Sequence, residues 1–199
     1  MGLILSGIQT PGFMGKGFMQ RCCLDHGLYL VKGPNGTGKS VFLNSLIGFY
    51  GQPPDIVKDN GEKAVVSYFN QDSYAATESA YWNLFLGHAS SPPSWADPGR
   101  AVQLLAAFGM AHVVSGLDPV LSPGLLSGGQ LKKLGLIRTL LRPADLVLLD
   151  EPTNDLDQQS VHVLLEHLRQ LAMHACVVAV THDRSFESLP HRDLSLFDD

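Results

Sequence analysis

Residues 33–40 read GPNGTGKS, a run that fits the pattern G-x-x-x-x-G-K-[ST]. The run follows the apolar stretch LYLV (28–31) and opens the helical pattern KSVFLNSLIGFY (39–50). This context separates a phosphate-binding loop from a generic glycine-rich turn, because the backbone N–H groups of such a loop surround phosphate groups at the start of a helix. The sequence therefore predicts a nucleotide-binding loop inside an α/β fold.

The residues of this loop have separate predicted tasks. Gly33, Gly36 and Gly38 allow the backbone to curl tightly. Lys39 supplies a cation to the β- and γ-phosphates of a nucleotide, and the Ser40 hydroxyl is placed to ligate Mg²⁺. The predicted nucleotide-binding residues of this segment are Gly33, Pro34, Asn35, Gly36, Thr37, Gly38, Lys39, Ser40 and Val41.

A second segment, LVLLDEPTNDLD (146–157), places two carboxylates at the end of an apolar strand. We expect Asp150 to hold Mg²⁺ through water at the carboxyl end of a buried strand. Glu151 is then positioned as a general base for an attacking water. An acidic strand end alone more often has a capping or loop role, but the phosphate-binding loop upstream favours the catalytic interpretation.

Short apolar strands alternate with helical patterns along the chain, which predicts an α/β architecture. The uninterrupted apolar runs LVLL and VVAV suit a sheet covered on both faces. A more helical insert lies between about residues 75 and 130 and contains the proline-broken loop SSPPSWADPG. The predicted strands are 3–7, 28–33, 64–70, 145–150 and 175–181, the predicted helices are 39–50, 77–87, 99–109, 130–141 and 157–173, and 10–18 is predicted as loop or hairpin.

Charge and composition limit the partners of this chain. It carries 14 Lys and Arg against 19 Asp and Glu, a net charge of −5, so nucleic acid is disfavoured as a primary or direct partner. No apolar run approaches the ~20 residues that span a bilayer and no leader is evident, so we expect a soluble chain without membrane insertion of its own. The three cysteines suit free thiols in a reducing cytoplasm better than a redox pair.

Two adjacent glycines, Gly128 and Gly129, stand where an amphipathic helix begins in LLSGGQLKKL (125–134). Glycine in a helix interior costs roughly 1 kcal/mol relative to alanine, so the pair needs a reason. A turn is the simplest reason. The other is that a helix start without side chains exposes N–H groups and the positive end of the helix dipole, which form an anion site. We expect Lys132 and Lys133, in the same helix, to form a solvated face.

With LSGGQ (126–130) beside the two earlier segments, the chain from about residue 28 to residue 184 resembles the ATP-binding cassette (ABC) ATPase family. LSGGQ is the hallmark pentapeptide of that family and is highly specific. The resemblance implies three further elements, and the sequence supplies them in order: Gln71 in YFNQD, a loop ending in Asp157, and His182 in AVTHD. It implies that Gln71 contacts the metal and the attacking water, that the loop of Asp157 belongs to the nucleotide site, and that His182 contacts the γ-phosphate.

The resemblance also implies that two cassettes pair head to tail, with C₂ symmetry. The signature residues Ser127, Gly128, Gly129 and Gln130 of one chain would close over the γ-phosphate of the ATP held by Lys39 of the other. Two ATP molecules with Mg²⁺ then join the pair, and hydrolysis loosens it. The second cassette is either a copy of this chain or a different chain.

The fold that the resemblance implies is a P-loop NTPase core with a mostly parallel sheet, an N-terminal antiparallel β portion and a helical subdomain insert. We expect one ABC ATPase domain over residues 1–199, with the core in 1–74 and 131–199 and the helical subdomain in about 75–130. Val41 stands where the family usually has threonine, so one hydroxyl contact to the nucleotide is missing. Phe13 is the best candidate for the ring that stacks on adenine and Phe18 the next, against simple core packing.

Two roles are compatible with this resemblance. The favoured one is the ATPase subunit of a membrane transporter, at the cytoplasmic face of the membrane, with a separate permease docking near Gln71 and residues 72–95. The alternative is a soluble ATPase acting on ribosomes or nucleic acid, because EPTNDLD and THDRSF resemble the translation-associated ABC-F group. That group carries two cassettes and a charged linker, which this sequence lacks. A non-hydrolysing partner cassette is disfavoured, because Lys39, Asp150, Glu151 and His182 are all present.

Overall fold

The computed structural model describes residues 2–8, 21–34, 36–86, 93–114 and 116–195. The chain forms two compact units. The first unit contains Met1–Tyr68, Ala144–Pro152 and Leu168–Asp199, and the second contains Phe69–Pro143 and Thr153–His167. The phosphate-binding loop and the acidic strand end therefore belong to the first unit, and LSGGQ belongs to the second.

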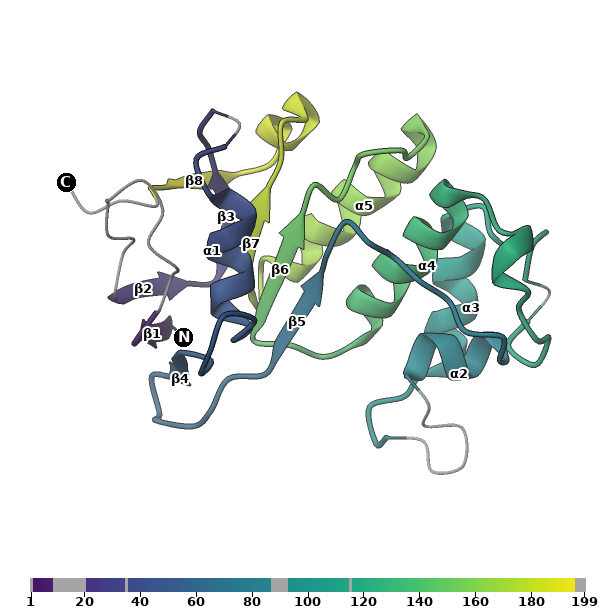
Figure 1. Cartoon of the computed structure of the whole chain (residues 1–199), viewed down its shortest axis with the longest axis horizontal. Coiled ribbons are helices and arrows are strands. Elements are labelled where there is room, and N and C mark those ends of the chain that lie inside the picture. The colour runs from purple at the N-terminus through teal and green to yellow at the C-terminus, as the bar shows by residue number, and fades with distance from the viewer. Residues whose placement is uncertain (1, 9–20, 35, 87–92, 115, 196–199) are drawn as a thin grey trace. The chain divides into compact units, whose positions relative to one another are not determined.

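A five-stranded sheet with the strand order β5-β6-β7-β3-β8 forms the centre of the first unit (Figure 1). Its strands are β5 (Val66–Phe69), β6 (Leu146–Asp150), β7 (Cys176–Val180), β3 (Gly27–Val31) and β8 (His191–Leu194). β3 pairs in parallel with β7 and β8, and β6 pairs in parallel with β7. Every residue of β6 and β7 is buried, as expected for strands covered on both faces.

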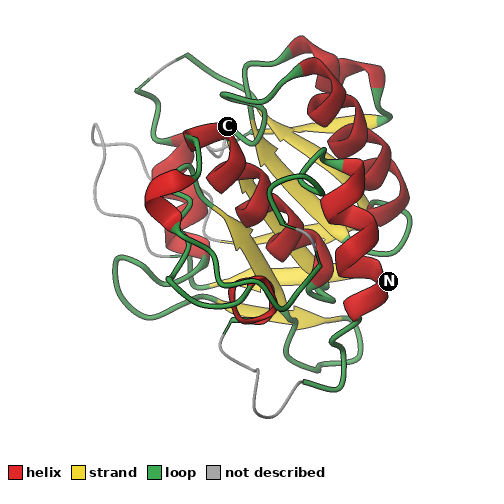
Figure 2. Cartoon of the chain, turned by 90° about the vertical axis from the view of Figure 1, so that its right-hand side faces the viewer, coloured by secondary structure: helices red, strands yellow, loops and turns green. Residues whose placement is uncertain are grey.

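A separate three-stranded antiparallel sheet has the order β2-β1-β4. Its strands are β1 (Gly2–Ser6), β2 (Arg21–Asp25) and β4 (Asp55–Lys58). Leu3 and Leu5 of β1 are buried while their neighbours are partly exposed, which is the alternation of a sheet with one face on a core. Figure 2 shows the strands of both sheets in yellow.

Helix α1 (Lys39–Leu46) follows the phosphate-binding loop and buries Phe42, Leu43 and Leu46 in the core of the first unit. The sequence pattern predicted a helix as far as residue 50, and that boundary is wrong. Gly48 has a φ of 78°, and a Cβ there would lie 2.8 Å from the nitrogen of Pro53, so the chain turns away after Leu46.

The second unit is helical. It contains α2 (Ala80–Phe85), α3 (Pro98–Ala107), the short 3₁₀ helix Pro123–Leu125, and α4 (Gly128–Leu141), against which α2 and α3 pack (Figure 1). Ser79 caps α2 by accepting a hydrogen bond from Trp82 N, and Asp97 caps α3 in the same way. Helix α5 (Gln158–Leu171) begins in this unit and ends in the first one.

The α/β prediction and its two sheet types are confirmed. Strands β2, β4 and β8 and the 3₁₀ helix Arg184–Ser188 were not predicted, and residues 10–18 lie outside the described part of the chain. The solvated face predicted for Lys132 and Lys133 is wrong, because Lys132 is buried and the Lys133 side chain is only 14% exposed. Among the described helices, none has the length and apolar character needed to cross a membrane.

Candidate functional site

The loop between β3 and α1 is shaped by glycines with left-handed backbone. Gly36 has a φ of 80° and Gly38 a φ of 87°, conformations that side chains other than glycine rarely adopt. Thr37 Oγ1 donates a hydrogen bond to Pro34 O at 2.9 Å, which closes the loop on itself. The loop leads directly into the first turn of α1, whose N-terminal N–H groups are available to an anion.

Lys39 is buried beneath this loop, with a relative exposure of 7%. Its Nζ donates to Gly33 O at 2.8 Å and to Pro34 O at 3.0 Å. Neutral carbonyls satisfy its hydrogen bonds without cancelling its charge, so the ammonium group retains a strong attraction for phosphate oxygens. The loop therefore holds a nearly desolvated cation where the sequence predicted the β- and γ-phosphates.

Ser40, in the first turn of α1, lies beside Asp150 at the end of β6. Ser40 Oγ donates a hydrogen bond to Asp150 Oδ1 at 3.1 Å. A hydroxyl and a carboxylate side by side are the hard oxygen ligands that Mg²⁺ takes when it also binds phosphate groups and water. The pair fits the predicted Mg²⁺ site.

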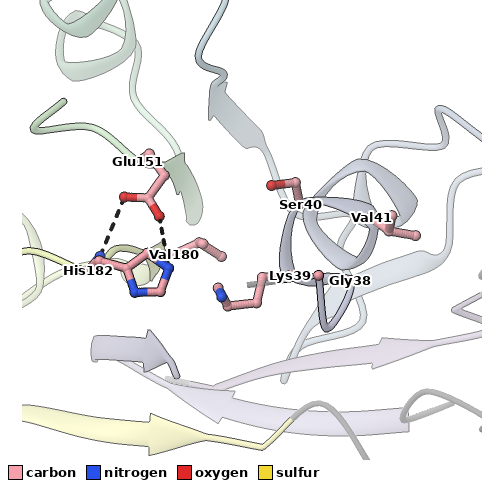
Figure 3. Close-up of a pocket in the computed structure, with 8 residues that line it drawn as sticks. Gly38, Lys39, Ser40, Val41, Glu151, Val180 and His182 are labelled. Atoms are coloured by element: carbon pink, nitrogen blue, oxygen red, sulfur yellow. Dashed lines mark hydrogen bonds and ion pairs between the residues drawn. The ribbon is translucent and has the colours of Figure 1, made fainter. Parts of the chain in front are cut away.

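Glu151 adopts a backbone conformation that is unusual for its residue type. Its φ is 45°, and its N–H donates to Val180 O at 2.8 Å. Its carboxylate lies 3.6 Å from His182 Nε2 and accepts a hydrogen bond of 3.4 Å from His182 N (Figure 3). Left-handed backbone at a residue other than glycine costs of order 1–3 kcal/mol and is concentrated at functional sites.

These residues line one cavity of about 320 Å³ in the first unit. Figure 3 shows Lys39 and Ser40 from α1 and Glu151 and His182 from the ends of β6 and β7 around it. The lining residues are Gly36, Gly38, Lys39, Ser40, Val41, Glu151, Val180 and His182. A cation, a hydroxyl and a carboxylate at one opening can bind a phosphate chain and orient a water toward it. Val180 is the lining residue that sequence reasoning missed, although it lies only two positions before His182.

The LSGGQ segment begins α4 in the second unit. Ser127 Oγ accepts from Gln130 N at 3.2 Å, and Gln130 Oε1 accepts from Ser127 N at 2.8 Å, so the two form a capping box. The two glycines are the first residues of the helix and not its interior. A Cβ on Gly129 would lie 3.0 Å from Asp155 O, whereas a Cβ on Gly128 would meet no atom within 4 Å.

Asp157 also lies in the second unit, and its carboxylate accepts hydrogen bonds from two residues of that unit. Lys133 Nζ donates to its carboxylate at 2.6 Å, and Ser160 N donates at 2.8 Å. The Lys133 ammonium and then the Ser160 N–H lower the pKa of Asp157 to about 2. Lys133 was predicted to lie on a solvated face, and its ion pair with Asp157 was not predicted from the sequence.

The remaining predicted residues are placed as follows. Gln71 is exposed in the second unit, two residues beyond β5. Phe13, Phe18 and Asn35 lie outside the described residues. The roles of all three in nucleotide binding stay predictions.

Residues 23–154 match the protein family described as ABC transporter. The chain belongs to the ABC ATPase family. Members of this family bind ATP with Mg²⁺ and hydrolyse it, and the cavity around Lys39, Ser40 and Glu151 fits that chemistry.

Three similar proteins show the range of the family. The energy-dependent translational throttle protein EttA of Mycobacterium tuberculosis is 32% identical over 162 residues, 81% of this chain and 28% of that protein. A lactococcin transport/processing ATP-binding protein, LcnC-like, of Lactococcus lactis is 30% identical over 175 residues, 81% of this chain and 24% of that protein. An inward-facing structure described as a metal-chelate type ABC transporter has a TM-score of 0.65 and 26% identity, over 98% of this chain and 79% of that chain. The chain thus spans about a quarter of the length of the curated relatives it matches.

Proposed function

We propose that this ABC ATPase is the ATP-hydrolysing subunit of a membrane transporter, which it energises through ATP-driven closure of a cassette dimer. The observation that carries the proposal is the distribution of phosphate-binding groups between the two units. All residues that line the cavity belong to the first unit, and the LSGGQ helix start belongs to the second. A second phosphate-binding segment on the same chain is explained if it serves the nucleotide of a partner cassette.

In this proposal the cavity residues divide the chemistry among them. Lys39 and the loop N–H groups bind the β- and γ-phosphates, while Ser40 and Asp150 hold Mg²⁺ together with Gln71. Glu151 accepts the proton of the attacking water, and His182 hydrogen-bonds the γ-phosphate. Ser127 and Gly129 of the second cassette complete the site, with the loop of Asp157 beside it. The Mg²⁺ ion supplies charge neutralisation to the phosphates.

Two comparisons support coupling to transport. The metal-chelate type transporter structure aligns with 98% of this chain at 26% identity, and the lactococcin protein is a transport ATP-binding protein by its name. In a transporter of this type the cassettes sit at the cytoplasmic face of the membrane and a separate permease docks on them. We expect that docking to involve Gln71 and residues 72–95.

The test is to look for a multi-span membrane protein encoded in the neighbouring reading frames and to reconstitute the chain with it. We expect the chain to copurify with that protein in detergent and its ATP turnover to rise when both are placed in proteoliposomes. No association with any multi-span membrane protein, together with cosedimentation on ribosomes, would contradict the transporter role.

The second candidate is a soluble ABC-F-like ATPase acting on ribosomes or nucleic acid. It is favoured by the 32% identity to EttA, whose name describes a translational throttle, and by the segments EPTNDLD and THDRSF. The net charge of −5 argues against a direct nucleic-acid partner. Ribosome cosedimentation of the Glu151→Gln variant with ATP separates the two candidates, because only the second predicts it.

A further inference from the structure

Residues 71–76, the segment that contains Gln71, are held against helix α4 by Arg138. Arg138 Nε donates a hydrogen bond to Asn83 O at 2.8 Å, and Arg138 Nη2 donates to Tyr74 O at 3.1 Å. The guanidinium carbon also lies 5.0 Å from the centre of the Tyr74 ring, within the range of a cation–π contact. All three residues belong to the second unit, so these contacts lie within one compact body.

Arg138 binds main chain and not a counterion. Within the part of the chain that the structure describes, no carboxylate lies within ion-pair distance of its guanidinium. Burial lowers the pKa of Arg138, which means that part of its hydration has been given up for these contacts. A planar guanidinium that donates to two carbonyls fixes their separation and direction more tightly than a single hydrogen bond does.

One turn earlier on α4, Gly135 allows the same segment to approach closely. A Cβ at Gly135 would lie 2.6 Å from Ser73 Oγ and 3.2 Å from a ring carbon of Phe69. Glycine in a helix interior costs roughly 1 kcal/mol relative to alanine, and this contact explains why it stands here. Gly135 and Arg138 are three residues apart and therefore share one face of the helix.

The far end of the segment is fixed by Asn83 of α2. Its side chain accepts from Ala76 N at 2.8 Å and donates to Ala76 O at 3.1 Å. The main chain on the C-terminal side of Gln71 is thus held by hydrogen bonds at Tyr74 and Ala76, while Gln71 itself stays exposed. The backbone of the segment is constrained, and the Gln71 side chain remains accessible.

We propose that Arg138 is a positioning residue for ATP hydrolysis, which fixes the main chain beside Gln71 on helix α4. The proposal rests on the proposed role of Gln71 at Mg²⁺ and the attacking water. A residue placed in this way contributes to turnover without touching the nucleotide, because a displacement of ~1 Å at a catalytic group can cost up to ~100-fold in rate.

The first experiment measures steady-state ATP turnover and its Mg²⁺ dependence. Arg138→Met is expected to lower kcat between about 10- and 100-fold, to raise the Mg²⁺ concentration for half-maximal turnover, and to leave the KM for ATP within about twofold. Arg138→Lys keeps the charge without the planar fork and is expected to recover only part of the loss.

Arg100→Met is the matched control. Arg100 Nη2 donates to Leu140 O at 3.2 Å, so this variant also removes an arginine-to-carbonyl bond at α4, but one that ends on Leu140 and not on the segment 71–76. It is expected to keep wild-type turnover and Mg²⁺ dependence. Equal losses in Arg138→Met and Arg100→Met would overturn the proposal, since both would then reflect general damage to the unit.

A double-mutant cycle with Gln71→Ala tests whether Arg138 acts through Gln71. In the Gln71→Ala background, Arg138→Met is expected to lower kcat by less than about twofold more, because the group it positions is already gone. If the kcat of the double variant instead falls by the product of the two single losses, Arg138 acts independently of Gln71, and the proposal is overturned.

Hydrogen exchange measured by mass spectrometry tests, independently of turnover, whether Arg138 holds the main chain beside Gln71. Arg138→Met is expected to speed exchange over residues 72–76, while exchange in α1 and β6 stays as in the wild type. Unchanged exchange over residues 72–76 would overturn the proposal even if turnover falls. If the wild-type chain shows no ATP turnover, the proposed function is contradicted instead. The exchange result would then still report whether Arg138 holds residues 72–76.

Discussion

Glu151 shows how the chemistry of the cavity depends on the backbone of one residue. Its φ of 45° turns the chain directly after β6, and the hydrogen bond from its N–H to Val180 O holds that turn. The carboxylate consequently lies beside His182 and not in the core of the sheet. The carboxylate could be identified from the sequence but not the strained turn that orients it, because a glutamate carries no sequence signal for a positive φ.

Replacing Glu151 with Gln is expected to leave ATP binding intact and to slow turnover by about 10²–10⁴-fold, the usual contribution of a general base. Phosphate release in single-turnover experiments measures the change. Glu187→Gln, at an exposed position in the first unit, is the control and is expected to turn over normally. Unchanged turnover in Glu151→Gln would remove Glu151 from the role of base.

Replacing Lys39 with Ala is expected to weaken nucleotide binding at least tenfold, because charge-assisted hydrogen bonds to phosphate are lost and only neutral N–H groups remain. Equilibrium titration with a fluorescent ATP analogue measures it. Lys32→Ala is the matched control, since Lys32 precedes the loop and pairs at the surface with Asp193 at 3.0 Å. Equal affinities of the two variants would contradict the assignment of Lys39.

At the scale of elements, the strands and helices with strong apolar patterns could be predicted from the sequence. The runs LVLL and VVAV became β6 and β7, and the glycine-rich loop stands between β3 and α1. Strands β2 and β8 contain charged residues and exposed positions, so no apolar pattern in the sequence predicted them. The same limit explains Lys132, which is buried with its Nζ 6.0 Å from the centre of the Phe69 ring, a residue far away in the sequence.

The two signature glycines give a prediction that separates folding from function. Gly129→Ala is expected to lower the free energy of unfolding by about 1–3 kcal/mol, because its Cβ would crowd Asp155 O. Gly128→Ala is expected to keep or slightly raise it, since its Cβ meets no atom within 4 Å. Turnover is nevertheless expected to fall in Gly128→Ala, where the partner's phosphate is proposed to approach. Thermal melts and turnover assays measure both, and full turnover in Gly128→Ala would contradict that approach.

The ion pair between α4 and the start of α5 predicts a pH dependence. The pKa of Asp157 is about 2 in the folded chain against 3.8 as the ordinary value, so its stabilisation is complete above about pH 3.8 and is lost as the pH falls toward 2. Lys133→Met is therefore expected to destabilise the chain at pH 7 by no more than about 1 kcal/mol, because the Asp157 side chain is 55% exposed and solvent screens the pair. The difference should disappear near pH 2. Urea titrations at several pH values measure it, and a difference that persists at pH 2 would contradict this assignment.

At the scale of the whole molecule, both segments of the proposed composite site could be identified from the sequence, but not what brings them together. The loop, Asp150, Glu151 and His182 lie in one unit, and Ser127 to Gln130 lie in the other. The sequence of one chain does not identify the partner that binds its surface. Whether two cassettes complete each other's sites is therefore the claim on which the proposed function depends.

Multi-angle light scattering of the Glu151→Gln variant tests this claim most directly. With saturating ATP and Mg²⁺ we expect a mass near twice the 21.5 kDa of one chain, and without nucleotide we expect the mass of one chain. If this chain pairs with a different cassette, the same ATP-dependent doubling appears only when that cassette and the permease are present. A strictly monomeric variant under saturating ATP and Mg²⁺, even beside its membrane partner, would contradict the account.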